Sequence, residues 1–169
     1  MSWPAATIAL ALATCPAEAA ELNFCWIGDN HYTMRGRIGF NDRHLDATLL
    51  TETDISSFEI TGYEHGIAIG SWNMNDRDAS TTWHLRFSPR DLIFPTGGHY
   101  PSDNAQGWNA DGDVENCGRR GFGFNTGNYA QDICLFGVYV SQSSIAPDTP
   151  LRATIHPVTI DCRVEQQLS

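Results

Sequence analysis

The sequence contains no lysine, so all ten of its cationic side chains are arginines. Without lysine the chain cannot form a lysine Schiff base or supply the phosphate-binding lysine of a P-loop. Asp and Glu together number 20, which gives a formal net charge of -10 at pH 7. Such a surface repels a phosphate backbone, so we expect no nucleic-acid partner.

Several patterns of known catalytic or metal chemistry are also missing. The histidines are scattered singly, without the i, i+4 pair or the glutamate partner of a zinc hydrolase helix. Residues 70–74 (Gly-Ser-Trp-Asn-Met) lack the flanking glycines of a nucleophile elbow. No Cys-x-x-Cys pair occurs, and the cysteine spacings are too wide for a zinc knuckle. These absences argue against serine catalysis and against zinc bound by cysteine.

The first twenty residues have the features of a signal peptide. Residues 3–14 are uncharged and rich in Ala, Leu and Ile, and Ala17-Glu18-Ala19 supplies the small residues that signal peptidase requires. A dozen apolar residues in a helix cover about 18 Å, short of the roughly 30 Å hydrocarbon core. We therefore expect cleavage after Ala19 or Ala20 and no transmembrane anchor in the mature chain. Thr14 is bulky for a lipoprotein motif, which makes lipid anchoring at Cys15 the poorer interpretation.

Removal of this leader leaves four cysteines, and an even number in an oxidising compartment predicts two disulfides. Four cysteines allow three pairings, and sequence alone does not choose among them. We expect Cys117 to pair with Cys134 across a local hairpin. We expect Cys25 to pair with Cys162 and so to join the first and last strands. The predicted localisation is secreted or periplasmic.

Residues 21–169 are enough for a single domain, and they carry strand signals but almost no helical periodicity. Apolar and polar side chains alternate over residues 32–40, and a turn at 28–30 links this strand to one over 22–27. Thr51 and Asp54 fit a single helical turn. Further short strand signals lie at residues 57–60, 67–69, 83–87, 121–125, 133–140 and 153–164. We predict an all-β fold of seven to nine strands, either an antiparallel β-sandwich or a flattened β-barrel.

The front half of the chain resembles a known group of exported proteins. The motifs that carry the resemblance are Phe24-x-Trp26-x-Gly28, residues 32–36 (Tyr-Thr-Met-Arg-Gly) and residues 50–60 (Leu-Thr-Glu-Thr-Asp-Ile-Ser-Ser-Phe-Glu-Ile). With them, residues 22–87 are similar to the N-terminal part of PEP-CTERM-type bacterial secreted proteins. No Pro-Glu-Pro motif follows Cys162, so the resemblance does not extend to surface sorting. It implies an exported, β-rich domain of unknown activity.

The segment 95–118 is the region where we expect function. It is rich in Gly, Asn and Asp without alternation, and loops of this length are uncommon unless they are functional or disordered. Aromatic faces pack on sugar rings while amides and carboxylates bond sugar hydroxyls. The candidate ligand-binding residues are His99, Tyr100, Trp108 and Asn109. Trp108 is expected to be exposed, whereas the other strand tryptophans, Trp26, Trp72 and Trp83, are expected in the core.

Asp111, Asp113 and Glu115 follow Asn109 in the same loop at two-residue spacing. Oxygen ligands in this rhythm resemble the start of a calcium loop. The match is incomplete, because Gly112 occupies the fourth place rather than the sixth and the twelfth residue is an arginine. A solvated acidic loop held by the disulfide of Cys117 is the stronger interpretation, and a calcium site is the weaker one.

These patterns predict an exported binding protein that recognises a polysaccharide or an envelope protein through the 95–118 loop. One alternative is an envelope-associated hydrolase that uses Asp111, Asp113 and Glu115, because a glycosidase needs two carboxylates roughly 5 to 9 Å apart. Another is a structural or assembly subunit of an envelope complex, whose sheet edge pairs with a partner. Binding is favoured over catalysis because nothing around the three acids would raise the pKa of one of them.

Overall fold

A computed structural model describes residues 19–111, 117 and 121–165, and in them the chain forms thirteen strands and four 3-10 helices. The strands are β1 (Ala19–Ile27), β2 (Tyr32–Asn41), β3 (Leu50–Thr51), β4 (Ile55–Glu64), β5 (Ile67–Asn73), β6 (Trp83–His84), β7 (Arg86–Phe87), β8 (Ile93–Phe94), β9 (Gln106–Trp108), β10 (Phe122–Thr126), β11 (Gln131–Leu135), β12 (Val138–Tyr139) and β13 (Leu151–Thr154). The 3-10 helices are η1 (Asp42–His44), η2 (Glu52–Asp54), η3 (Met74–Asp76) and η4 (Ser141–Ser143). Eight strands have three or more residues, and the other five have two.

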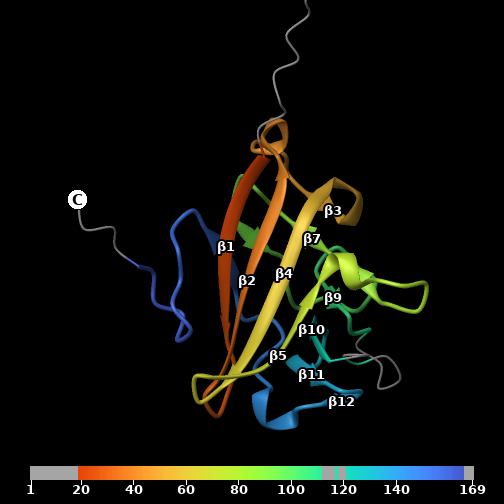
Figure 1. The fold of residues 1–169 in the computed structure, drawn as a ribbon. Coiled ribbons are helices and arrows are strands. Elements are labelled where there is room, and N and C mark those ends of the chain that lie inside the picture. The colour runs from red at the N-terminus through yellow and green to blue at the C-terminus, as the bar shows by residue number, and fades with distance from the viewer. Residues whose placement is uncertain (1–18, 112–116, 118–120, 166–169) are drawn as a thin grey trace, which may run out of the picture.

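The strands form two antiparallel sheets and a small pair. The six-stranded sheet has the order β5-β4-β2-β1-β13-β8, the five-stranded sheet has the order β12-β11-β10-β9-β6, and β3 pairs with β7. Figure 1 shows the long strands β1, β2, β4 and β5 side by side, with the shorter strands of the second sheet to their lower right. Neither main sheet closes on itself within the described residues. The predicted antiparallel sandwich with two disulfides is therefore confirmed, and the flattened barrel is not what forms.

The opening hairpin and the single turn are confirmed. β1 and β2 pair along their whole length, from Ala19 opposite Asn41 to Ile27 opposite Thr33. The turn of η2 is closed by Thr51, whose backbone N–H donates to Asp54 Oδ2 over 2.9 Å. In contrast, the single strand expected over 83–87 is divided between β6 and β7, which belong to different sheets. Side-chain alternation continues across this break, so it could not reveal the change of partner.

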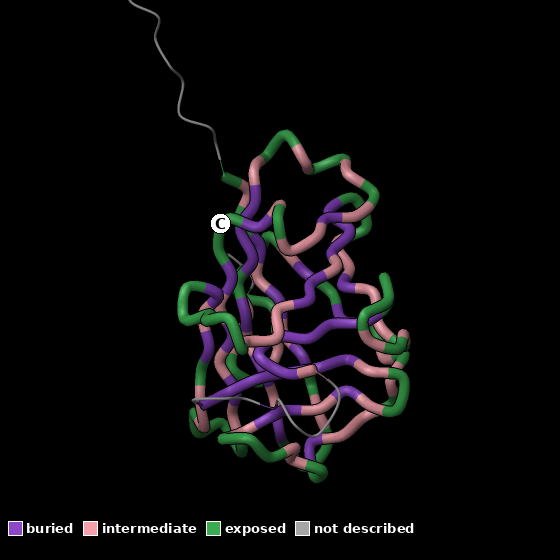
Figure 2. Tube along the Cα trace, turned by 90° about the vertical axis from the view of Figure 1, so that its right-hand side faces the viewer, coloured by how far each residue is buried: buried purple, intermediate pink, exposed green. Residues whose placement is uncertain are grey.

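The core lies between the inner faces of the two main sheets. Trp108 on β9 is 0 % exposed, and its ring centroid lies 4.7 Å from that of Phe58 on β4 and 5.2 Å from that of Phe124 on β10. Figure 2 shows such buried stretches alternating along the strands through the interior. Trp26 and Trp72 are buried as predicted, and Trp83 is half-buried against the same core.

Close approach of the sheets depends on a glycine. A Cβ atom on Gly62 of β4 would lie 2.1 Å from Cε2 of Phe122, far inside van der Waals contact. Phe122 therefore packs directly on the backbone of the opposite sheet. Any larger residue at position 62 would push β10 away from β4.

Both disulfide pairings are confirmed. Cys25 bonds to Cys162 and Cys117 bonds to Cys134. The expectation that Cys162 lies in a last strand is wrong, because the last strand is β13 and residues 155–165 return along the outer face of β2. There, the chain is held by side-chain contacts such as the hydrogen bond from Thr33 Oγ1 to the carbonyl oxygen of Ile160 over 2.7 Å. Figure 1 shows this segment in blue beside β1.

The predicted leader, residues 1–18 with Cys15, lies outside the described residues. β1 begins at Ala19, so the predicted cleavage sites after Ala19 or Ala20 fall at its first two residues. Either cut leaves the β1 and β2 pairing intact from Glu21 opposite Gly39 onward. The signal peptide itself stays a prediction.

Candidate functional site

The outer face of the five-stranded sheet presents polar side chains from neighbouring strands. Asn125 of β10 lies directly opposite Asp132 of β11, and Cys134 of β11 lies opposite Tyr139 of β12. Residues opposite one another in an antiparallel pair point to the same face, as do residues two apart along a strand. The register therefore brings Asn125, Asp132, Cys134 and Tyr139 together on the face that points away from the core.

The loop that follows β8 covers part of this outer face. Gly107 of β9 lies opposite Asn125, and Tyr100 packs where a side chain at position 107 would stand, 3.5 Å from the place its Cβ would occupy. The loop also reaches the β10–β11 turn, because His99 Nδ1 lies 3.3 Å from Asn128 Oδ1. Cys117 is tied to the same face through its disulfide with Cys134.

Between the loop and the sheet lies a hollow of about 130 Å³, which we call the tyrosine pocket. Three tyrosines, one histidine, two aspartates and two asparagines line it: Tyr100, Tyr129, Tyr139, His99, Asp111, Asp132, Asn125 and Asn128. Tyr129, in the turn between β10 and β11, is 88 % exposed. The ring of Tyr129 is therefore open to contact by a ligand.

The amide of Asn125 is the most unusual group in the tyrosine pocket. Asn125 is only 4 % exposed, and its Nδ2 has no hydrogen-bond partner among the described residues. A buried N–H without a partner costs about 1–3 kcal/mol, so a ligand oxygen that accepts this hydrogen bond would recover that free energy. The amide is therefore a hydrogen-bond donor in the lining of the pocket that no described residue uses.

Burial is the main influence on the pKa of the Asp132 carboxyl. Burial raises the pKa of Asp132, and a hydrogen bond from Ser144 Oγ opposes that shift without cancelling it. Proximity to a positive charge would stabilise the ionised carboxylate. The surroundings of Asp132 therefore favour either the protonated carboxyl or a carboxylate that has a cation close to it.

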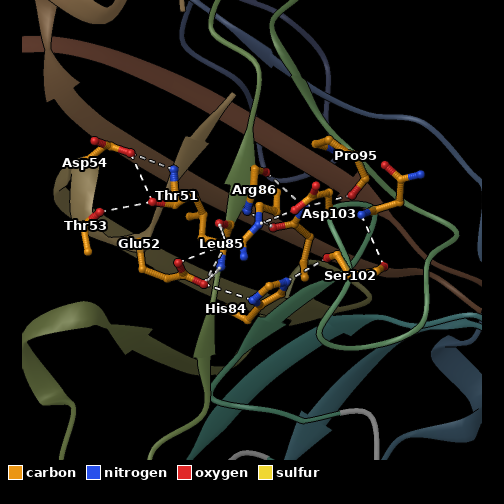
Figure 3. Close-up of polar contacts among 12 residues, drawn as sticks. Thr51, Glu52, Thr53, Asp54, His84, Leu85, Arg86, Pro95, Ser102 and Asp103 are labelled. Carbon is orange, nitrogen blue, oxygen red and sulfur yellow. Dashed lines mark hydrogen bonds and ion pairs between the residues drawn. The ribbon is translucent and has the colours of Figure 1, made fainter. Parts of the chain in front are cut away.

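A buried polar network supports the loop from behind (Figure 3). Glu52 Oε1 lies 3.0 Å from His84 Nδ1 and 2.9 Å from Arg86 Nη1. His84 Nε2 lies 2.9 Å from the carbonyl oxygen of Ser102, and the imidazole lies edge-on to the ring of Tyr100, with centroids 5.1 Å apart. The network therefore holds the position of Tyr100, one wall of the tyrosine pocket.

Glu52 is the most strongly shifted group in this network. Burial alone would raise its pKa, but hydrogen bonds from His84 and from the backbone N–H of Leu85, together with the charge of Arg86, lower the pKa to about 2. His84 is 4 % exposed and meets Ser102 through the backbone carbonyl, not through the hydroxyl. Glu52, His84 and Ser102 thus provide no activated nucleophile, and their role is structural.

The structure brings together some of the residues expected in the site and separates others. His99, Tyr100 and Asp111 all line the tyrosine pocket. The exposed platform expected at Trp108 is wrong, because Trp108 is 0 % exposed in the core. Asn109 is also buried, and its Nδ2 donates to the carbonyl oxygen of Phe122 over 2.9 Å.

The calcium interpretation gains no support from the described part of the chain. Asp113 and Glu115 lie outside the described residues. Within the residues that are described, no group of three or more His, Cys, Asp or Glu side chains could hold a metal ion. Asp111 serves instead as one wall of the tyrosine pocket.

Sequence reasoning missed five of the polar and aromatic pocket residues: Asn125, Asn128, Tyr129, Asp132 and Tyr139. Their signal was present, since Asn125 alternates with Phe124 and Asp132 alternates with Ile133 along their strands. Polar residues in such alternation are normally the solvated face of a sheet. Only the strand register and the course of the loop show that they face a pocket.

Two of the larger hollows contain polar groups that are already paired. One of about 670 Å³ on the outer face of the six-stranded sheet contains Arg37, but this side chain already pairs with Glu59 over 2.7 Å and with Glu21 over 3.5 Å. Another of about 650 Å³ contains Asp78, whose carboxylate accepts hydrogen bonds from Ser80 and Thr81. In both, the polar groups named satisfy one another.

No known protein family, no curated protein and no solved structure matches this chain. The resemblance of residues 22–87 to PEP-CTERM-type proteins therefore stays a prediction. Among the described residues, no helix has the length and apolar character needed to cross a membrane. The functional argument rests on the tyrosine pocket.

Proposed function

We propose that this protein is an exported binding protein that holds a sugar residue of a polysaccharide in the tyrosine pocket. The observation that carries the proposal is that one pocket is lined by the exposed ring of Tyr129 and by the buried amide of Asn125, whose Nδ2 has no partner among the described residues. Sugars combine apolar C–H faces with hydroxyls, so they match an aromatic wall that stands next to a hydrogen-bond donor. Two disulfides support the extracytoplasmic setting.

The size of the tyrosine pocket indicates how much of a glycan it holds. Pockets for drug-sized ligands are about 300–1,000 Å³. The tyrosine pocket encloses about 130 Å³ and opens beside Tyr129, so it fits one sugar unit with the rest of the chain outside. This is the arrangement expected for recognition of a chain end or of a single exposed unit.

Tyr129→Ala tests the proposal directly. Tyr129 is 88 % exposed, so its truncation leaves stability within about 0.5 kcal/mol, but it removes the aromatic wall and weakens retention on immobilised glycans at least about tenfold. Phe136→Ala is the matched control, because Phe136 is also a loop aromatic, is 73 % exposed and lies outside the pocket. Equal retention by wild type and Tyr129→Ala would contradict the proposed site.

Hydrolysis is a second candidate function, supported by one observation. Asp111 and Asp132 both line the tyrosine pocket, and burial raises the pKa of Asp132. A glycosidase requires two carboxylates whose pKa values are separated. If the protein is a hydrolase, wild type turns over a bound oligosaccharide and Asp132→Asn abolishes turnover. Absence of product from wild type after prolonged incubation with a retained oligosaccharide would leave binding alone.

A further inference from the structure

The tyrosine pocket has a marked charge character. Asp111 and Asp132 contribute two carboxyl groups to its lining. Eight of the ten arginines lie among the described residues, and none of those eight lines the pocket. The chain contains no lysine that could compensate. Among the described lining residues, only His99 carries positive charge, and only when it is protonated.

The aromatic rings add to the same preference. Tyr100, Tyr129 and Tyr139 bring three aromatic rings to one small hollow. A cation over the face of a tyrosine ring is attracted by the ring quadrupole, and this attraction grows as the site is desolvated. Carboxylates and aromatic faces therefore favour the same class of ligand group, namely an ammonium.

We propose that the sugar unit held in the tyrosine pocket carries a free ammonium group, as in the glucosamine units of a de-N-acetylated polysaccharide. This inference rests on the proposed sugar-binding function. The ammonium pairs with the carboxylate of Asp132 and lies against the tyrosine rings. A hydroxyl or ring oxygen of the same unit accepts the hydrogen bond that Asn125 Nδ2 lacks.

Other sugar classes fit this chemistry less well. A uronic acid would place its carboxylate near Asp111 and Asp132, where like charges repel. An N-acetylated sugar could accept from Asn125 through its acetyl carbonyl, but it would offer no cationic group to the carboxylate of Asp132. Glucosamine and N-acetylglucosamine differ only in the group on the C2 nitrogen, so this pair provides the controlled comparison, and galacturonic acid adds a sugar of opposite charge.

The experiment is calorimetric titration of the protein with three trimers at pH 6, where amines and ordinary carboxyls are both charged. The trimers are built from glucosamine, N-acetylglucosamine and galacturonic acid. We expect the glucosamine trimer to bind at least tenfold more tightly than the N-acetylglucosamine trimer, and the galacturonate trimer to show no saturable binding. Asp132→Asn should reduce the affinity for the glucosamine trimer about tenfold and leave the affinity for the N-acetylated trimer unchanged.

A charge-matched variant separates a site from bulk attraction, because the whole chain is acidic. Asp46→Asn removes the same charge from an exposed position that does not line the tyrosine pocket, and it should change neither affinity. A melting curve of Asp132→Asn confirms that the variant is folded. Equal losses in Asp46→Asn and Asp132→Asn would overturn the proposal.

The remaining outcomes distinguish the two levels of inference. N-acetylglucosamine binding as tightly as glucosamine would overturn the ammonium preference and leave sugar binding standing. Tighter binding of the galacturonate trimer would overturn the preference as well. No binding of any of the three trimers would contradict the proposed function together with the preference that rests on it.

Discussion

The two faces of the five-stranded sheet are built from the same strands and serve different purposes. On the inner face Trp108, Phe124 and Ile133 lie side by side across β9, β10 and β11, each 0 % exposed. On the outer face Asn125 and Asp132, one residue further along, line the tyrosine pocket. A shift of one position along a strand moves from the core to the lining of the proposed binding pocket, because successive side chains point to opposite faces.

The largest effect is expected on the inner face. Trp108→Ala removes a fully buried ring from the centre of the core, which should lower the free energy of unfolding by about 3 to 5 kcal/mol. Chemical denaturation would measure this loss, with the exposed Tyr129→Ala as the outer-face reference. Similar losses in both variants would show that the two faces do not differ as described.

The next effect concerns the disulfide that ties the loop to the outer face. Replacing both Cys117 and Cys134 by alanine opens a link with a sequence separation of 17, which should cost about 3 kcal/mol of stability. Because Cys117 belongs to the loop, we also expect weaker glycan binding. The control replaces Cys25 and Cys162, which should lower the melting temperature while the glycan affinity at a permissive temperature is retained. Loss of affinity in both double variants would show that the effect is general.

A smaller and pH-dependent effect is expected at Glu52, behind the pocket wall. Its folded pKa of about 2 lies below the ordinary value of 4.5, so its stabilising contribution is present above about pH 4.5 and is lost as the pH falls toward 2. Glu52→Gln should therefore cost about 3 kcal/mol at pH 7, and the difference from wild type should narrow across that window. Urea denaturation at several pH values measures how this difference in the free energy of unfolding changes with pH.

Asp132 is expected to give a pH dependence of stability opposite to that of Glu52. Burial raises its folded pKa, so its contribution to stability decreases as the pH rises through that pKa. Asp132→Asn should be more stable than wild type at neutral pH, with the difference vanishing in acid. The environments assigned to the two carboxyl groups would be contradicted if the stability difference from wild type changed with pH in the same direction in Glu52→Gln and in Asp132→Asn.

The strands of the sheets could be predicted from the sequence where apolar and polar side chains alternate over many residues. Residues 32–40 form most of β2 because their apolar side chains recur at every second position, and the turn residues after Ile27 mark the hairpin. Both cysteine pairings agree with the expectation, although sequence alone left three pairings open. The division of residues 83–87 between two sheets was not, because alternation records which face is buried and not which strand is adjacent.

Only part of the candidate site could be predicted from the sequence. Loop length and composition located His99, Tyr100 and Asp111, whereas Trp108 was misplaced because a tryptophan flanked by Gly and Asn resembles a loop residue. In the structure Trp108 is the inward residue of a three-residue strand. Asn125 and Asp132 could not be assigned without register, since a polar residue in a strand has the same local pattern whether it faces water or a ligand.

The bond between Cys25 and Cys162 spans a sequence separation of 137 and so encloses most of the chain in one covalent circuit. A protease that cuts once inside it, for example in the exposed stretch 75–80 after β5, leaves two fragments still joined. Such a nicked molecule keeps its mass on a non-reducing gel and separates into two bands only after reduction. A chain with this closure keeps both fragments of its sheet joined after a single proteolytic cut.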